Sequence, residues 1–283
     1  MSETAKSHPE ADEESTTKEP PAEAASEADD NATPVTDGST AIVRALENGG
    51  VEHAFGVQGG AIMPVYDALW DSDIEHITMA HEQGAAHAAD AYGVVANEPG
   101  IALATSGPGA TNLVTGIADA NMDSDAMVAL TGQVPSDMVG SDAFQETDTT
   151  GVTMPITKHN WFAASADSIG DTVGEAFALA ESGRPGPTLV DLPKDVSFEE
   201  TDVEPGEPAL PAGSEPPTTA DQESVEAAAS TIERAEKPLL LLGGGVIKAE
   251  ATDTAREFAR EHGIPVVTTM PGIGTYPEDD DLC

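Results

Sequence analysis

From about residue 39 onward, two patterns of apolar positions alternate along the chain. Short runs rich in β-branched and apolar residues, typical of β-strands, are followed by longer segments in which apolar residues recur at helical spacing. Strands separated by helices of about ten to fifteen residues predict an α/β fold, a parallel sheet covered by helices on both faces. The predicted strands are 51–57, 74–79, 101–105, 127–130 and 188–192, and the predicted helices start at Asp37 or Ser39, after Gly60, near Glu82, at Ala110 and near Ile169.

Three features follow directly after predicted strands. They are the loop at Gly59 and Gly60, the loop at 106–109, and Glu82 at the start of an apolar helix that continues to Asn97. In open parallel sheets, ligands bind beyond the carboxyl ends of the strands. We therefore expect these features to lie together at one edge of the sheet.

Composition divides the chain into four parts. Residues 1–36 have almost no large apolar side chains, so they are predicted to be a disordered acidic tail. Residues 37–200 form the first α/β domain, and 201–220, crowded with Pro, Glu, Gly and Thr, form a linker. Residues 221–283 begin a second, Rossmann-like α/β unit that we expect to be truncated, with helices at 222–234 and 249–262, strands at 238–242 and 264–268, and a triple glycine, Gly243, Gly244 and Gly245.

The charge of the chain narrows the range of partners. It carries 52 acidic and 11 basic residues, a formal net charge of −41, and the acids are spread through the patterned segments. Such a chain repels nucleic acid and anionic membrane surfaces, and it repels itself at low ionic strength. Because molar salt shortens the Debye length to about 3 Å, we expect a salt-loving source organism. The alternative is an ordinary acidic protein with an acidic tail.

Other compositional features indicate a cytoplasmic protein. Cys283 is the single cysteine, so neither an intramolecular disulfide nor a thiolate metal cluster is expected. No apolar run approaches the length of about 20 residues that crosses a bilayer, and no basic and apolar signal sequence begins the chain.

Each motif has an ordinary explanation when it is considered alone. An acid in the first helical turn, such as Glu82, is stabilised by the helix dipole. The Ser106–Gly109 loop and the triple glycine are common turns between a strand and a helix, and an isolated Lys158 is typical of a surface residue. His81 and His87 lie six positions apart, which does not place them on one helical face, so no protein-ligated metal site is predicted.

Taken together and in order, the motifs resemble the acetolactate synthases, a family of thiamine-diphosphate enzymes. The resemblance runs from about Ser39 to the end of the chain, interrupted only at the linker. Gln58, Asp125-Ala126 and Met270-Pro271 depart from the usual residues of the family. The motifs are His-Glu-Gln-Gly-Ala-Ala-His from 81, Thr-Ser-Gly-Pro-Gly-Ala-Thr-Asn from 105, Thr-Gly-Gln-Val-Pro from 131, Asp-Ala-Phe-Gln-Glu from 142, Ile-Thr-Lys-His-Asn from 156 and Ser-Gly-Arg-Pro-Gly-Pro from 182.

The resemblance implies a thiamine-diphosphate-binding fold and a reaction in which the cofactor performs the chemistry. Pyruvate loses carbon dioxide, and the remaining two-carbon unit is added to a second 2-oxoacid to give acetolactate or acetohydroxybutyrate, the first step of branched-chain amino-acid biosynthesis. The carboxylate of Glu82 would hydrogen-bond the pyrimidine ring and promote proton transfer there. The resemblance further assigns Gly60, Phe144, Gln145 and Lys158 to the substrate side, Gly59, Gly107, Pro108 and Asn112 to thiamine diphosphate, and Arg184, Gly243, Gly244, Gly245 and Thr269 to a structural, non-redox FAD.

The resemblance also implies partners. In the family a third, C-terminal domain holds Mg²⁺ and the diphosphate, and no matching segment occurs in this sequence. We therefore expect the chain alone to be inactive, and the assembled enzyme to be a homodimer or tetramer, with or without a small regulatory subunit. Two alternatives stay open: another thiamine-diphosphate carboligase or decarboxylase, against which Phe144, Gln145 and Lys158 argue, and a non-catalytic relic that binds a partner.

Overall fold

The computed structural model describes residues 36–214 and 216–283. The predicted acidic tail lies outside these residues, except for Thr36. Strand β1 (Thr36–Asp37) pairs antiparallel with β8 (Glu200–Thr201), so the beginning and the end of the first domain lie side by side.

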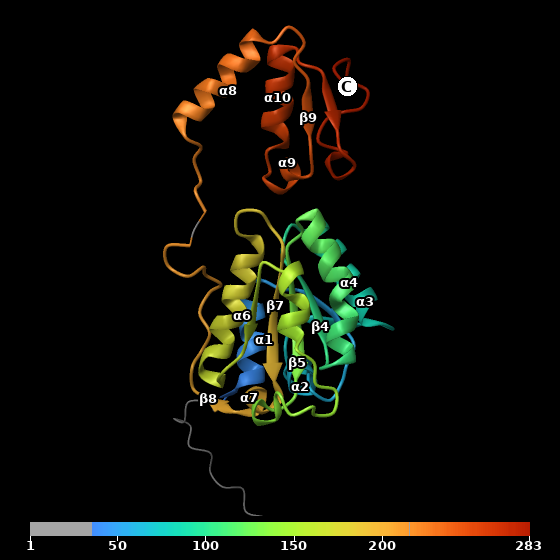
Figure 1. Ribbon diagram of the computed structural model, residues 1–283, viewed down its shortest axis with the longest axis vertical. Helices are drawn as coiled ribbons and strands as arrows, with labels where there is room; N and C mark the ends of the chain where they lie inside the picture. Colours follow the sequence, from blue (N-terminus) through green and yellow to red (C-terminus); the bar gives the residue numbers. More distant parts are fainter. Residues whose placement is uncertain (1–35, 215) are drawn as a thin grey trace, which may run out of the picture. The chain divides into compact units, whose positions relative to one another are not determined.

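In the described part of the chain, six parallel strands form the predicted sheet (Figure 1), in the order β3-β2-β4-β5-β7-β6. The chain passes from β2 outward to β3 and then returns to β4 on the other side of β2. This reversal is a topological switch point, the place where open α/β sheets bind ligands. The strands are β2 (His53–Gly56), β3 (Glu75–Thr78), β4 (Gly100–Ala104), β5 (Met127–Gln133), β6 (His159–Phe162) and β7 (Pro187–Pro193).

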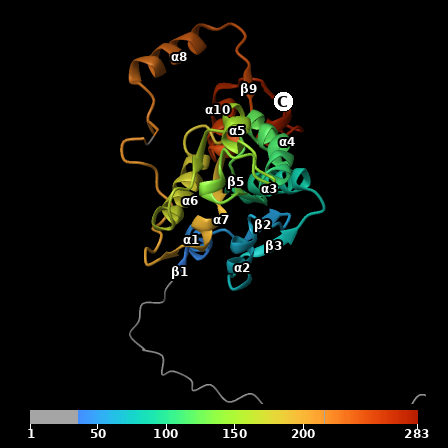
Figure 2. The same cartoon turned by 60° about the horizontal axis from the view of Figure 1, so that its bottom comes forward.

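Helices cover both faces of this sheet, as the sequence predicts. In Figures 1 and 2, α1 and α6 lie on one side of the strands and α3 and α4 on the other. The first layer consists of α1 (Gly38–Asn48), α2 (Met63–Trp70), α6 (Ala166–Glu181) and α7 (Lys194–Phe198), and the second contains α3 (Glu82–Ala96), α4 (Pro108–Asp123) and the short α5 (Thr149–Thr153).

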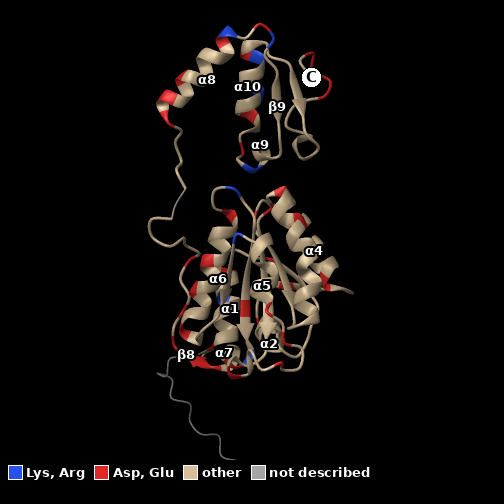
Figure 3. Ribbon diagram, in the orientation of Figure 1, with Lys and Arg blue, Asp and Glu red and all other residues tan. Residues whose placement is uncertain are grey.

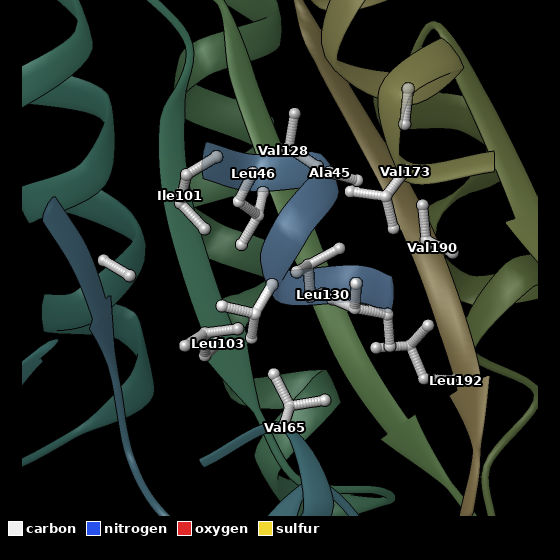
Figure 4. Packing of buried hydrophobic residues seen from close by; sticks show 14 of the residues in the cluster. Ala45, Leu46, Val65, Ile101, Leu103, Val128, Leu130, Val173, Val190 and Leu192 are labelled. Carbon is white, nitrogen blue, oxygen red and sulfur yellow. The ribbon is translucent and has the colours of Figure 1, made fainter. Parts of the chain in front are cut away.

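Large branched side chains fill the face of the sheet beneath α1 and α6 (Figure 4). Leu46 of α1 and Val173 of α6 belong to one cluster with Leu103 and Leu130 of the central strands, and all four are fully buried. Burial of a side chain of this size contributes about 1.5–3 kcal/mol before the cost of ordering the chain. This face is therefore a major source of the domain's stability.

Small residues form the opposite face, where backbones approach closely. A Cβ atom added to Gly116 of α4 would lie 2.4 Å from the Cβ of Ala86 of α3, and one added to Gly100 of β4 would lie 1.8 Å from the carbonyl oxygen of Ala89. No side chain fits at such distances. The contact between α3, α4 and β4 thus depends on glycine and alanine at these positions.

Helix α1 begins as the sequence predicts. The carboxylate of Asp37, the N-cap, accepts hydrogen bonds from the backbone N–H of Thr40 at 2.8 Å and from the hydroxyl groups of Ser39 and Thr40. After the helix, Gly50 has a φ of +77°, a left-handed conformation that favours glycine. Both ends of this helix are therefore encoded locally.

The sequence did not predict the edge strand β6. Its residues, His159-Asn160-Trp161-Phe162, are all exposed or half-buried, because an edge strand next to β7 needs no continuous apolar run. The 3₁₀ turns η1 (Ser136–Met138) and η2 (Met154–Ile156) were also not predicted.

Residues 221–283, considered by themselves, form a smaller α/β segment. Strands β9 (Leu240–Leu242) and β10 (Val266–Thr268) pair in parallel over a core of Leu242, Ala259, Val266 and Tyr276. The predicted helix at 249–262 begins three residues later, at Thr252, because Glu250 adopts a left-handed backbone with φ of 52°. Leu241 and Val267 leave 67% and 42% of their surface exposed, as expected for a sheet covered incompletely. The helices are α8 (Gln222–Arg234), α9 (Gly245–Lys248) and α10 (Thr252–His262), followed by the turn η3 (Met270–Gly272).

Acidic residues far outnumber basic ones on the helices and loops of the described chain (Figure 3). Between residues 36 and 200, the basic residues are Arg44, Lys158, Arg184 and Lys194. Arg44 pairs with Glu204, and the Lys194 ammonium lies 6.0 Å from the centre of the Phe198 ring. Among the described residues, no helix has the length and apolar character to span a membrane.

Candidate functional site

The candidate site lies at the switch point of the sheet. β2 ends just before Gly59 and Gly60, β4 ends just before the loop that leads to Gly107, and β3 leads into the helix that begins at Glu82. Since these three strands are parallel neighbours, their carboxyl ends bring the loops to one edge. The expectation that these features share an edge is confirmed.

Glu82 and Asn112 meet in this region. Glu82 is the first residue of α3, and Asn112 lies near the beginning of α4. The Nδ2 atom of Asn112 donates a hydrogen bond of 2.9 Å to Oε2 of Glu82, although the two residues are 30 positions apart. Both side chains are half-buried. Among the described residues no other side chain bonds this carboxylate, so Oε1 is available to a further donor.

The glycines of the β2 loop differ in their surroundings. A Cβ atom on Gly59 would lie 2.5 Å from the Cβ of Thr105, and the hydroxyl of Thr105 accepts the backbone N–H of Ala61 at 3.2 Å. Gly60 faces open space, with no atom within 4 Å of a Cβ placed there. Gly59 is thus fixed by packing, whereas Gly60 leaves room beside the loop.

A second loop, Val134–Asp148, packs against the start of α4. We call it the β5–α5 loop. A Cβ on Gly107, whose φ is +60°, would lie 2.5 Å from the carbonyl oxygen of Gln145. Phe144, next to Gln145, leaves 87% of its surface exposed. The structure therefore brings Gly107, Pro108 and the backbone of Gln145 together, with the Phe144 ring directed to solvent.

Tyr66 of α2 is a neighbour of Glu82 that the sequence did not single out. Burial, with a smaller contribution from the negative charge of Glu82, raises the pKa of Tyr66 far above its usual value. Its ring packs edge to face with His76, with ring centres 4.6 Å apart. Within the described residues, the Tyr66 hydroxyl and Nε2 of His76 are buried without hydrogen-bond partners. No sequence pattern marks this pair, because it is formed by α2 packing on β3.

Lys158 does not join the group around Glu82. Its backbone N–H bonds to the carbonyl of Pro187, the first residue of β7, and its Nζ donates to the carbonyl oxygens of Leu179 and Ser182 at the end of α6. Burial lowers the pKa of Lys158. β6 starts directly after Lys158, which places this residue at the amino edge of the sheet, away from Glu82.

The residues expected to contact flavin lie in two separate parts of the chain. Arg184 precedes β7, and its Nε donates to the Ser124 hydroxyl at 2.7 Å. In the C-terminal segment, Gly243 follows β9 and Thr269 follows β10, and a Cβ on Gly243 would lie 3.7 Å from the Thr269 hydroxyl. Gly244 and Gly245 continue this loop into α9.

Packing of α3 on α4 also brings together His87, Asp90 and Asp119. One ligand atom of each lies within 4.8 Å of the others, and Nδ1 of His87 is 3.3 Å from Oδ2 of Asp119. Burial, followed by the charges of Asp125 and other acids, raises the pKa of Asp90 to about 7. No sequence pattern marks this group, because the three residues come together only through the packing of α3 on α4. Exposed acidic groups are common without a metal, so the group alone assigns no ion.

The geometry around Glu82 fits thiamine diphosphate. A half-buried carboxylate, held from one side by Asn112, can bond a polar ring atom through its free oxygen, and the start of α3 stabilises the negative charge. The open space at Gly60 allows a planar group and a second reactant to approach. The absence of a side chain at Gly109 leaves room beside the carboxylate, since a Cβ placed there would lie 3.5 Å from Oε1 of Glu82.

Family models match two parts of the chain. Residues 36–152 match the thiamine pyrophosphate enzyme N-terminal TPP binding domain, and residues 225–283 match the thiamine pyrophosphate enzyme central domain. The first match contains Glu82, Asn112 and both loops of the candidate site.

Several similar proteins are named acetolactate synthase large subunit. The acetolactate synthase large subunit of Corynebacterium glutamicum is 52% identical over 247 residues, which cover 87% of this chain and 39% of that protein. Those of Parasynechococcus marenigrum and Pyropia yezoensis are 47% and 45% identical, over 90% and 87% of this chain and 42% and 43% of the relatives. The chain thus spans about two fifths of the length of these relatives. With the N-terminal TPP binding domain, its switch-point carboxylate and these homologues, the chain belongs to the thiamine pyrophosphate enzymes, alongside the acetolactate synthase large subunits.

Proposed function

We propose that the chain takes part in acetolactate synthase catalysis, a transferase reaction that decarboxylates pyruvate and joins the product to a second 2-oxoacid. The observation that carries the proposal is the Glu82 carboxylate, held by Asn112 at the switch point beside the open position at Gly60. The family match and the relatives named acetolactate synthase large subunit support it.

When bound, thiamine diphosphate would supply a nucleophilic carbon and accept the electron pair left by carbon dioxide. Glu82 would exchange a proton with the pyrimidine ring through Oε1, because Asn112 occupies Oε2. Gly60 would leave space for the 2-oxoacid, and Gly59, Gly107 and Pro108 would shape the loops around the ring. Phe144 and Gln145 would contact the substrate from the β5–α5 loop. Lys158 would supply positive charge for the 2-oxoacid; within this chain its ammonium group donates to carbonyl groups at the end of α6.

The remaining assignments concern groups that the chain would share with a larger assembly. We include Mg²⁺, held with the diphosphate by a further domain, and a structural FAD near Arg184, Gly243, Gly244, Gly245 and Thr269. The contact of Gly243 with Thr269 at adjacent strand ends supports a ligand loop there. A cytoplasmic homodimer or tetramer, with or without a regulatory subunit, is the proposed form, and the chain by itself would be inactive on pyruvate.

Substitution Glu82→Gln tests the proposal. The full chain is assayed at high salt with pyruvate, thiamine diphosphate, Mg²⁺ and FAD, together with a separately expressed C-terminal half of an acetolactate synthase large subunit. We expect turnover to fall by about 10²–10⁴-fold, the range for loss of a positioned proton-transfer group, while thiamine diphosphate still binds.

Glu47→Gln, at an exposed site of α1, is the matched control and should retain wild-type turnover. Near-normal turnover of Glu82→Gln would contradict a catalytic role, and Glu82 would then only stabilise the start of α3 through the helix dipole. Acetaldehyde as the product of the wild-type assembly, in place of acetolactate, would identify a decarboxylase. Acetolactate formed by the chain alone would overturn the expected inactivity.

A further inference from the structure

A buried carboxylate lies on β7, one strand beyond the neighbour of β4, and has no part in the proposed chemistry. Asp191 of β7 is 2% exposed and lies near the carboxyl end of the sheet. Its Oδ1 accepts the Thr131 hydroxyl at 2.7 Å, and its Oδ2 accepts Nε2 of Gln133 at 2.9 Å. Among the described residues no Lys or Arg pairs with it. Burial is the largest cause that raises the pKa of Asp191 to about 6, while the bonds from Thr131 and Gln133 oppose the rise.

Gln133 connects this carboxylate to the β5–α5 loop. Besides bonding Asp191, its Nε2 donates to the carbonyl oxygen of Thr147 at 2.9 Å, and its Oε1 accepts the backbone N–H of Val134 at the same distance. Val134 begins the loop and Thr147 is near its end. One buried side chain, 2% exposed, therefore holds both ends of the loop together.

Asp195 holds the loop a second time. This residue of α7 follows Asp191 by four positions, and its Oδ1 accepts the backbone N–H of Ser136 at 2.8 Å while Oδ2 accepts the Ser136 hydroxyl. Hydrogen bonds to a charged acceptor are stronger than those between neutral groups. The segment from β7 to α7 thus fixes the loop at its base and at its third residue.

Inside the loop, Glu146 fixes the part that approaches the site. Its carboxylate accepts the backbone N–H of Gly140 and, at 2.8 Å, that of Ala143. This turn presents Phe144 to solvent and places the Gln145 carbonyl against Gly107. Gly107 in turn precedes the helix that carries Asn112, the partner of Glu82. A continuous series of contacts therefore runs from Asp191 to the candidate site.

We propose that Asp191 and Asp195 are positioning residues, which hold the β5–α5 loop so that Phe144 and Gln145 stand beside the start of α4 and contact the 2-oxoacid substrate. The assignment of the loop to the substrate rests on the proposed function. The hold on the loop rests on the hydrogen bonds alone. An isolated buried carboxylate is unfavourable in a protein interior, and here its bonds all serve the loop or the strand that enters it.

Hydrogen exchange of the full chain tests the hold directly. Asp191→Asn removes the charge of the acceptor that Thr131 and Gln133 bond, so we expect amides of residues 134–148 to exchange at least about tenfold faster, the change that weakening of one hydrogen bond to a charged group produces. Amides of β4 and β5 should keep their protection. Asp195→Asn, at an exposed position, should loosen the same loop less and folds even if the buried variant does not.

Asp167→Asn is the matched control. Oδ1 of Asp167 accepts the Thr201 hydroxyl at 2.7 Å on α6, away from the loop, so this variant loses a comparable bond without loosening residues 134–148. The proposal would be overturned if residues 134–148 of Asp195→Asn exchanged at the wild-type rate. General acceleration in Asp191→Asn that includes β4 and β5 would also count against it, unless Asp195→Asn shows the local effect.

Kinetics of the assembled enzyme test the link to substrate. Asp191→Asn should raise the KM for pyruvate and lower kcat/KM by up to about 10²-fold, as for other misplaced positioning groups, whereas the affinity for thiamine diphosphate should stay unchanged, since Glu82 and Asn112 are retained. An equal fall in cofactor affinity would overturn the link. A wild-type assembly that forms no acetolactate would contradict the proposed function. It would not affect the result on the loop, because hydrogen exchange is measured without substrate.

Discussion

The two faces of the central sheet are packed by different means. Beneath α1 and α6, the space is filled by side-chain volume, with residues such as Leu46, Leu103 and Leu130 fully buried. Beneath α3 and α4, the helices and strands approach so closely that Gly100 and Gly116 leave no room for a Cβ atom. On the face beneath α1 and α6, large side chains separate the helix and strand backbones. On the face beneath α3 and α4, the backbones are in close contact.

This difference explains where the candidate site can form. Glu82 lies in the first turn of α3, and Asn112 lies near the first turn of α4. If the two helices separated, the side chains could not form their hydrogen bond. The contact at Ala86 and Gly116 keeps the two helices close, so that the carboxylate and the amide meet at 2.9 Å. The face built from large side chains contributes stability, whereas the face built from small residues determines the geometry of the site.

The largest effect is expected on the face with large side chains. Leu46→Ala removes a fully buried side chain and leaves a cavity, so the free energy of unfolding should fall by about 2–5 kcal/mol. Urea denaturation measures the change. Leu239→Ala, where the side chain is 59% exposed, is the control and should change stability by less than about 0.5 kcal/mol. A similar loss for both variants would show that the face under α1 is not the main core.

A smaller loss of stability, with a larger change in the site, is expected on the other face. Gly116→Ala introduces a methyl group 2.4 Å from the Cβ of Ala86, so overpacking should lower the free energy of unfolding by about 1–3 kcal/mol. Separation of α3 from α4 should also weaken thiamine diphosphate binding, which Leu46→Ala should leave unchanged under conditions where that variant is folded.

Matched substitutions sharpen this result. Ala86→Gly in combination with Gly116→Ala should recover part of the lost stability, because it removes the other methyl group. Gly245→Ala adds a methyl group where no atom lies within 4 Å, so it should have little effect on stability. If Gly116→Ala is as harmless as Gly245→Ala, the close contact of the two helices is not a requirement.

The smallest effect concerns pH on the α3 and α4 face. Because burial and neighbouring acids raise the pKa of Asp90 to about 7, the folded state holds this proton more tightly than the unfolded state. The contribution to stability is present below about pH 4 and is lost as the pH rises through about 7. Asp90→Asn should remove this loss, with a gain on the order of 1 kcal/mol at pH 8 because solvent screens the partly exposed carboxylate.

Chemical denaturation between pH 5 and 8 measures this effect. The difference in stability between Asp90→Asn and the wild type should grow with pH. Asp73→Asn, at an exposed site outside this face, provides the control. A pH dependence that is the same in Asp90→Asn and the wild type would assign the titration to another group.

Local signals in the sequence were sufficient to predict much of this arrangement. The apolar runs at β4, β5 and β7, the N-cap at Asp37 and the glycines after β2 are encoded within a few residues, so the central strands and their order of appearance were predicted. β6 was missed because a half-exposed edge strand has no apolar run. The start of α10 was predicted three residues too early, because the left-handed backbone of Glu250 delays it to Thr252.

The parts of the candidate site that could not be predicted from the sequence are contacts between segments far apart in the chain. The sequence identified Glu82 and Asn112 separately through the family resemblance, but their hydrogen bond depends on the packing of two helices. Tyr66 belongs to no local motif and was not predicted. The same holds for the hydrogen bond that Gln133 donates to Asp191. The resemblance assigned Lys158 to the substrate side, and only the direction of β6 shows that this residue lies at the edge of the sheet opposite to Glu82.

The pairing of β1 with β8 has a consequence for how the first domain connects to other chain segments. Thr36 lies opposite Thr201 and Asp37 opposite Glu200, so the polypeptide enters and leaves the domain at one corner. Chain termini that lie close together are the condition under which circular permutation and domain insertion are tolerated. A short peptide that joins residue 201 to residue 36 would leave every strand of the six-stranded sheet in its described place. We therefore expect residues 36–201 to tolerate insertion into another protein without a change in how the switch point is built.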